Sequence, residues 1–517
     1  MPEKDILATK NPSTPKPQPG HVQAPGTFNT PKIAKHHLHL WRITFGVLIV
    51  FALIIIGLGL HVMGVGSKVF HGNNNSSTLS QIGKLIIPGD RELRNDGKHR
   101  TNILLVGYGG EGHDGAYLAD TIIFASLDQA SNEVAMLSIP RDFLVELPGY
   151  GFRKINNALA FGMTGENPEG GNQMLIKAVE EITGQTVHYY AKADFDGFKK
   201  AVDDLGGIDV TVDTAFNDFQ YPTYNYGYQT IKFESGQQHF NGEKALQFVR
   251  SRHGTNGEGS DFARSKRQQK ILFAFREKAL NAGTLTNPGK INSLLSTLGN
   301  HVSSNFELWE VSRLAAILKS LSPEKIVTRV LESVPDGLVK AATGLDGAYV
   351  LQPRIGLGNY QEIQALAANI FQLNQIAREA APIQIQNATA SKYLGNTAAH
   401  TLRGFNIDVI SSAELKTIRY ENSMIVDLSG GLAPQTISML QKKYNATVVN
   451  ELPADVTLLH ATEANSNYNT NDNSNQNTNT ATEIQPKILL LLGQSAVTIV
   501  NSEAKPNTKI LPQTSST

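Results

Sequence analysis

The 517-residue chain carries 46 lysines and arginines and 46 aspartates and glutamates, so its formal net charge is zero, and it contains no cysteine. This balance argues against a protein that binds nucleic acid over its whole surface, and we expect no nucleic-acid partner. The lack of cysteine excludes disulfides, thiolate catalysis and cysteine-based zinc sites. The length allows two or three domains.

The N-terminal region is predicted to end in a membrane anchor. Residues 1–39 are poor in apolar side chains and rich in Pro, Thr, Lys and Gln, which is typical of a disordered tail. The uncharged apolar run ITFGVLIVFALIIIGLGL follows, and we assign residues 40–63 to a transmembrane helix. A cleavable signal peptide is the alternative, because Gly64 and Gly66 would permit cleavage, but the run is long and far from the start.

Basic residues predict the orientation of this anchor. Lys32, Lys35 and Arg42 precede the apolar run, so the positive-inside rule places the N-terminus in the cytoplasm. The protein is therefore expected in the cell membrane as a single-pass protein with its main domains outside. Residues 64–98 are expected to form an extracytoplasmic linker.

A first globular domain is predicted over residues 99–375. Short runs rich in Ile, Leu and Val predict strands at 102–107, 121–127, 133–139 and 208–212, with a hairpin between the second and third. Helices are expected at 171–184, 195–207, 260–280, 305–321 and 359–380, together with one that begins near Gly242 and carries Arg250 and Arg252 at its end. Strands and helices mix without strict alternation, which predicts a three-layer α/β/α domain with a mixed central sheet.

The composition changes near residue 380. Alternating strand and helix patterns over 380–500 predict a small C-terminal β/α domain. An Asn/Thr-rich tract makes 463–485 an expected disordered insertion, and 501–517 an expected disordered tail.

The predicted helix at 260–280 carries fixed positive charge. Arg264, Arg267, Gln268 and Ile271 follow the spacing i, i+3, i+4 and i+7, so they share one face that becomes apolar and should point inward. Arginines placed there near the positive end of the helix dipole need an anion, and their planar forks suit phosphate oxygens. The alternative is that they are solvated or are paired with local acids such as Glu258.

Further charged residues are expected near strand ends. Arg141 follows a predicted strand in SIPRD, and Asp120 precedes another. The Gly-rich loop 107–115 contains Glu111 and Asp114, but matches neither the P-loop nor the dinucleotide-binding pattern. Because residues just past strand ends form ligand crevices, these groups could hold Mg²⁺ and a polyphosphate together.

Several ordered motifs resemble the LytR-CpsA-Psr family of extracytoplasmic phosphotransferases. They are NILLVG, ADTIIFASLD, LSIPRDFLVELP, KINNALAFG, FDGFKKAVDDLGGIDVTV, FNGEKALQFVRSR and DFARSKRQQ. The region after residue 380 resembles the family's LytR-type C-terminal domain. The resemblance implies a transferase that moves a glycopolymer from a polyprenyl-pyrophosphate carrier to peptidoglycan.

The resemblance also implies roles for particular residues. Asp120, Arg141, Arg252 and Arg264 would be catalytic. Substrate would be bound by Arg141, Lys154, Arg250, Arg252, Arg264, Arg267 and Gln268. Mg²⁺ would be held by Asp120, Asp114 and Glu111.

Two positions depart from the family pattern. Leu118 stands where the family usually has an arginine, and Tyr108 and Gly109 stand where an aspartate is usual. The missing arginine at 118 keeps a non-catalytic wall-polymer binding or regulatory protein as an alternative. A second alternative is a polyprenyl-pyrophosphate hydrolase, in which water takes the place of the acceptor. A lipid groove is expected near Phe195, Phe198 and Val202, although the same residues also suit an ordinary core.

Overall fold

The computed structural model describes residues 91–504, except 114, 164–169, 224–226, 281–300, 308–309, 311–312, 315–316, 318–319, 323–324, 345–346, 416–418, 460 and 463–482. The predicted N-terminal tail, the span 40–63 and most of the linker lie outside the described residues. So do nearly all of the predicted insertion, most of the C-terminal tail and much of the helix expected at 305–321. Within the described part of the chain, no helix has the length and apolar character needed to cross a membrane.

A six-stranded mixed sheet forms the centre of the first domain. Its spatial order is β11-β6-β1-β2-β3-β12. The strands are β1 (Arg100–Tyr108), β2 (Ala119–Asp128), β3 (Glu133–Ser138), β6 (Tyr189–Asp194), β11 (Val302–Ser304) and β12 (Ile326–Val330). β1 and β6 are parallel, as are β3 and β12, whereas β2 is antiparallel to both β1 and β3. The mixed sheet and the β2–β3 hairpin confirm the prediction.

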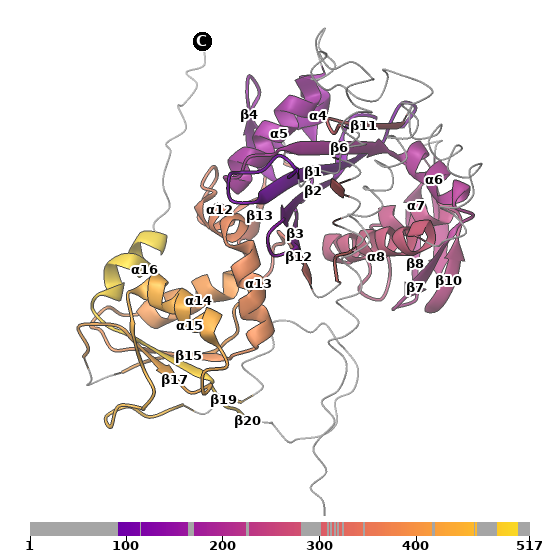
Figure 1. Ribbon diagram of the computed structural model, residues 1–517. Coiled ribbons are helices and arrows are strands. Elements are labelled where there is room, and N and C mark those ends of the chain that lie inside the picture. Colours follow the sequence, from indigo (N-terminus) through magenta and orange to yellow (C-terminus); the bar gives the residue numbers. More distant parts are fainter. Residues whose placement is uncertain are drawn as a thin grey trace, which may run out of the picture. The chain divides into compact units, whose positions relative to one another are not determined.

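Both faces of this sheet are buried, because apolar side chains of β1 alternate between two cores. Leu104 and Val106 belong to one core, and Ile103 and Leu105 to the other. The first core includes residues of α4 (Asn157–Gly162), α5 (Gly170–Thr183), α12 (Gln361–Ala368) and α13 (Ile370–Glu379). The second includes residues of α6 (Phe195–Asp204), α7 (Gly242–Arg250) and α8 (Asp261–Leu280). Figure 1 shows α5 and α8 on opposite sides of the strands, so the domain has three layers.

The single helix expected at 359–380 is two helices, since the chain leaves helical geometry at Asn369, where φ is −104°. The helix α7 ends at Arg250, so Arg252 lies beyond it rather than at its end. The strand expected at 208–212 is β7 (Ile208–Val212), which pairs with β10 (Gly236–Phe240). Three further hairpins were not predicted: β4 (Leu144–Leu147) with β5 (Gly151–Lys154), β8 (Phe216–Pro222) with β9 (Tyr228–Phe233), and β13 (Val339–Thr343) with β14 (Tyr349–Pro353).

Residues 383–504 form a second sheet with its own helices. Its strand order is β16-β15-β21-β17-β18. The elements are β15 (Ile383–Asn387), α14 (Leu394–Gly404), β16 (Val409–Glu414), β17 (Met424–Asp427), α15 (Pro434–Tyr444), β18 (Thr447–Val449), β21 (Ile488–Leu492) and α16 (Ala496–Ala504), with the short pair β19 (Ala461–Thr462) and β20 (Glu483–Ile484). This is a β/α arrangement, and α16 continues past residue 500.

Candidate active site

The topology of the first sheet brings several predicted site residues to one edge. β1, β6, β3 and β12 run in the same direction, because β2 is antiparallel to its neighbours on both sides. The carboxyl ends of these four strands therefore share an edge with the start of β2. Asp120 is the second residue of β2, and Arg141 follows the end of β3 by three residues. Ligand crevices form at such edges in open α/β sheets.

Arg141 contacts two carboxylates at this edge. Its Nη1 donates to Asp120 Oδ1 at 2.5 Å, and its Nε lies 3.6 Å from Asp142 Oδ2. Nε is buried and has no hydrogen-bond partner among the described residues. Because a buried donor without a partner is costly, this atom favours an additional acceptor in the site.

Lys154 joins the same cluster through the β4–β5 hairpin. The register of that hairpin pairs Leu144 with Lys154, which returns Lys154 to the start of β4. The backbone N–H of Asn156 then donates to the carbonyl of Arg141. Lys154 Nζ consequently donates to Asp142 Oδ1 at 2.6 Å.

Arg252 reaches Asp142 from a distant part of the chain, and Asp218 of β8 holds its backbone. Arg252 Nη2 lies 4.0 Å from Asp142 Oδ2. Asp218, only 1% exposed, accepts from Ser251 Oγ at 2.7 Å and from the backbone N–H groups of Arg252 and His253 at 3.1 and 3.2 Å. Burial by itself would raise the pKa of Asp218, but these hydrogen bonds outweigh it and lower the pKa. The charged form of Asp218 therefore orders the turn that carries Arg252.

Arg250, in the last turn of α7, is placed by aromatic rings. Its guanidinium carbon lies 4.6 Å from the ring centroid of Phe195 and 5.8 Å from that of Tyr221. Cation–π attraction therefore orients this side chain. Of the residues proposed for a lipid groove, Val202 is buried in the second core and Phe198 packs against it, as ordinary core residues do. Phe195 is buried outside that core, where its ring meets the ring of His113 edge-on at a centroid distance of 5.6 Å and lies under the Arg250 guanidinium.

The helix α8 points its predicted face inward. Ser260 Oγ accepts from the backbone N–H of Ala263, so Ser260 caps the helix. Arg264 is 8% exposed, Arg267 is 2% exposed, and Ile271 is fully buried. Gln268 lies on the same face and is half-buried.

Arg267 has a set of partners within the protein. Nε donates to Phe248 O, Nη2 to Ser251 O, and Nη1 both to Glu258 O and to Glu258 Oε2 at 2.7 Å. Burial lowers the pKa of Arg267, and the charge of Glu258 opposes that effect. Arg267 therefore connects α8 to the loop between α7 and α8. Its pairing with Glu258 agrees with the alternative that the arginines of this helix are paired with local acids. Its role as a substrate contact stays a prediction.

The predicted metal ligands are only partly gathered. Glu111 is exposed and accepts from Tyr117 Oη at 3.5 Å, whereas Asp114 lies outside the described residues. Asp120 uses Oδ1 for Arg141, and no hydrogen bond to its Oδ2 is formed within the described part of the chain. No cluster of three His, Asp or Glu side chains suited to a metal occurs among the described residues. A Mg²⁺ ion that is held mainly by phosphate oxygens needs only one or two protein carboxylates, and Asp120 Oδ2 would supply one of them.

The two departures from the family pattern lie at the end of β1, which Tyr108 closes, and in the loop that joins it to β2. A Cβ placed on Gly109 would lie 3.2 Å from His113 Cβ, so His113 would have to move by a few tenths of an ångström. Leu118 is half-buried, and its backbone N–H donates to Gly115 O. The loop folds back on itself at these positions.

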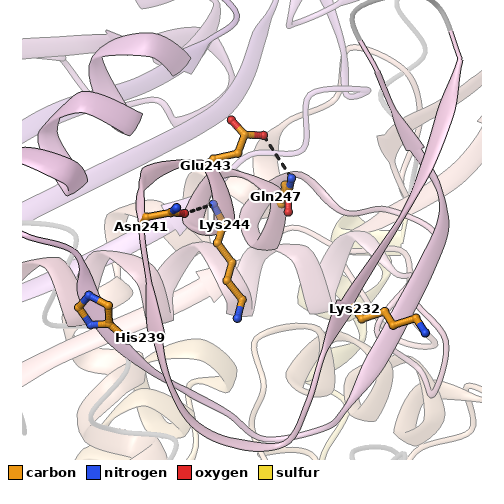
Figure 2. A pocket seen from close by; sticks show the side chains of 6 residues that line it. All are labelled: Lys232, His239, Asn241, Glu243, Lys244 and Gln247. Atoms are coloured by element: carbon orange, nitrogen blue, oxygen red, sulfur yellow. Dashed lines mark hydrogen bonds between the residues drawn. The ribbon is translucent and has the colours of Figure 1, made fainter.

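An open pocket lies elsewhere on the first domain. Figure 2 shows its lining residues, which come from β9, β10, and α7 with its N-cap: Lys232, His239, Asn241, Glu243, Lys244 and Gln247. None of them is a predicted site residue. Arg250 follows Gln247 by three residues, about 4.5 Å along the helix axis.

Two carboxylates that organise the cations, Asp142 and Asp218, were not predicted from the sequence. Asp142 directly follows Arg141 in the motif SIPRD, and that adjacency was the available signal. Asp218 lies in the strand β8, which was not predicted, so no local signal indicated it.

Comparison with protein families gives one match that covers more than half of the chain. Residues 69–355 match the model of the LytR_cpsA_psr family. This range contains all predicted site residues and ends before the second sheet.

Two curated relatives are teichoic acid transferases by name. The polyisoprenyl-teichoic acid–peptidoglycan teichoic acid transferase TagU of Oceanobacillus iheyensis is 32% identical over 218 residues, which are 42% of this chain and 62% of that protein. The chain thus matches less than two thirds of that relative's length. TagV of Bacillus subtilis, a transferase of the same name, is 30% identical over 292 residues, or 54% of this chain and 69% of that protein.

Solved structures of similar proteins were also found. The crystal structure of B. subtilis TagV is 28% identical, with a TM-score of 0.40, and the match covers 53% of this chain and 98% of that one. TagT bound to LI-WTA is 23% identical, with a TM-score of 0.39, and the match covers 55% of this chain and 94% of that one.

Proposed function

Because the chain belongs to the LytR_cpsA_psr family, we propose that it is a membrane-anchored extracytoplasmic phosphotransferase. Its substrate would be a glycopolymer linked to a polyprenyl-pyrophosphate carrier, and its acceptor would be peptidoglycan. The names of TagU and TagV support this choice, since both are transferases that act between a polyisoprenyl-linked polymer and peptidoglycan.

One observation carries the proposal: cations from three separate segments meet at the sheet edge beside Asp120. Arg141, Lys154 and Arg252 contribute three positive charges around Asp142, and Asp120 and Asp142 contribute two negative charges. The cluster therefore keeps an excess of one positive charge. A pyrophosphate would balance this excess and would supply an acceptor for the buried Arg141 Nε.

The proposed reaction is attack by a peptidoglycan hydroxyl on the phosphorus that bears the glycopolymer. A new P–O bond forms to the acceptor, the bond from that phosphorus to the bridging oxygen breaks, and polyprenyl phosphate leaves. The arginines stabilise the charge on the transferring and leaving phosphates. Asp120 Oδ2 is a candidate to accept the hydroxyl proton when it is not bound to the metal.

We propose Mg²⁺ as the cofactor. The ion would neutralise phosphate charge, with Asp120 as its main protein ligand and Glu111 and Asp114 as further candidates. An anchor at residues 40–63 would hold the domain at the membrane surface where the lipid carrier resides. It would place the protein in the cell membrane with its N-terminus in the cytoplasm.

Transfer can be tested with the full-length chain in detergent micelles, supplied with Mg²⁺, peptidoglycan and a carrier labelled in its glycopolymer. The expected result is label bound covalently to peptidoglycan, and its loss in Arg141→Ala. Arg153→Ala is the matched control, because Arg153 is an exposed arginine on β5 whose guanidinium, within the described part of the chain, bonds only its neighbour's carbonyl.

Two other outcomes would replace the proposal. Label released only in free, phosphate-bearing products would indicate the hydrolase. Binding of the carrier without turnover would indicate a wall-polymer binding or regulatory protein, an alternative raised by Leu118.

A further inference from the structure

Asp142 is a carboxylate that is 7% exposed and is contacted by cations from three segments. Lys154 approaches Oδ1 at 2.6 Å, while Arg141 and Arg252 approach Oδ2 at 3.6 and 4.0 Å. The three cations come from the segment after β3, from β5 and from the turn after α7. No other described carboxylate contacts as many of the predicted substrate-binding residues.

The backbone of Asp142 is firmly held. Its carbonyl accepts from the N–H of Leu351 at 3.0 Å, and the neighbouring carbonyl of Arg141 accepts from Asn156 N–H at 3.2 Å. Phe143, the next residue, is fully buried in the first core. The carboxylate is thus attached to a rigid part of the domain, whereas its three partners have long side chains with many rotamers.

Asp120 differs from Asp142 in both exposure and partners. The Asp120 side chain is 30% exposed and contacts one cation, whereas that of Asp142 is 10% exposed and contacts three. A substrate oxygen or a metal ion can compete for Asp120. Asp142 stays enclosed by the cations and keeps them apart at set positions.

We propose that Asp142 is a positioning residue that spaces Arg141, Lys154 and Arg252 to match the two phosphate groups of a pyrophosphate. This inference rests on the proposed function and deepens it, because it assigns the preference for pyrophosphate over a single phosphate to one residue. A variant without this carboxylate keeps the three cations, but nothing holds them at the spacing that matches a pyrophosphate.

The test is calorimetric titration of the full-length chain in micelles with inorganic pyrophosphate and, separately, with orthophosphate. The wild-type chain is expected to prefer pyrophosphate by about tenfold or more, since two phosphates engage more donors than one. In Asp142→Asn this preference is expected to fall to about threefold or less, because misplaced donors lose the second phosphate. Asp142→Glu should recover part of it.

The ratio of the two affinities separates positioning from other roles. If Asp142 acted only through its charge, Asp142→Asn would bind both anions more tightly and keep the ratio. If Asp142 only supported the fold, fewer molecules of Asp142→Asn would bind either anion. Those that still bind would keep the wild-type ratio of the two affinities. Either result would overturn the inference.

Two further variants keep the test decisive. Glu146→Gln changes an exposed carboxylate on the neighbouring strand β4 and should leave the ratio unchanged. If Asp142→Asn does not fold, Lys154→Met removes one of the three cations and should lower the ratio in the same direction.

The inference and the proposed function can fail separately. A wild-type chain that selects pyrophosphate but transfers no glycopolymer would overturn the transferase and leave Asp142 in its role. If the wild type transfers glycopolymer but Asp142→Asn keeps the ratio of affinities, the transferase stands and the positioning role of Asp142 is overturned. A wild-type chain that binds neither anion would overturn both.

Discussion

Asp218 Oδ2 accepts a hydrogen bond from the backbone N–H of Arg252 at 3.1 Å, although 34 residues separate the two in sequence. The same carboxylate accepts from Ser251 and His253, so the whole turn after α7 depends on it. The position of Arg252, a predicted catalytic residue in the turn after α7, is therefore determined by the buried Asp218 of β8.

Asp218→Asn should destabilise the protein by about 3 kcal/mol, because an amide nitrogen replaces an acceptor among buried N–H and O–H donors. Urea denaturation measures this. Asp209→Asn, on a half-exposed side chain of β7 paired with His239, is the control and should change stability little.

The pH dependence of stability follows from the lowered pKa of Asp218. The Asp218 carboxylate contributes its full share of the unfolding free energy above its unfolded-state pKa of about 4. That share is lost as the pH falls through the lower folded-state pKa. The difference in unfolding free energy between wild type and Asp218→Asn should therefore shrink in acid. A difference that stays constant from neutral to strongly acidic pH would contradict this assignment.

Arg252→Lys should weaken binding of a polyprenyl pyrophosphate by about tenfold although it keeps the charge, because the planar fork is lost. Calorimetry with the full-length chain measures the affinity. Arg153→Lys, at an exposed position on β5, is the matched control. Equal affinities for wild type and Arg252→Lys would mean that Arg252 is only a surface charge.

Arg267→Lys should lower stability by about 3 kcal/mol, since three carbonyls and Glu258 lose a buried partner. Substrate binding should fall with it, because Arg267 supports the loop next to Arg252. Thermal unfolding and pyrophosphate titration distinguish this supporting role from the direct substrate contact that the sequence predicted for Arg267. A direct substrate contact would weaken binding and leave the melting temperature unchanged.

Removal of divalent metal by EDTA should abolish glycopolymer transfer, and added Mg²⁺ should restore it. Asp120→Asn should lower the transfer rate about a hundredfold and raise the Mg²⁺ concentration needed for half-maximal rate. Transfer that persists in EDTA would show that the arginines alone neutralise the pyrophosphate.

Local sequence patterns predicted β1, β2 and β3, three of the six strands of the central sheet, but not β6, β11 or β12. In β1, continuous apolar residues supply two cores at once, and such a run is typical of a strand buried on both faces. The face of α8 that bears Arg264, Arg267 and Ile271 was predicted to point inward, and all three are buried. Periodicity determines which side of an element is buried, because that side is set by the geometry of the element itself.

The partners of those side chains depended on the tertiary structure. Arg267 was predicted to contact substrate, but it lies against the carbonyls of its own loop. Asp142 gathers cations only because the β4–β5 register returns Lys154 to it and Asp218 places the turn of Arg252. The sequence by itself determined the strands β1, β2 and β3, the inward face of α8 and the charges available. Which charges meet was decided by chain reversals and long-range hydrogen bonds, because an ion pair forms only between groups within a few ångströms, and no local pattern encodes that distance.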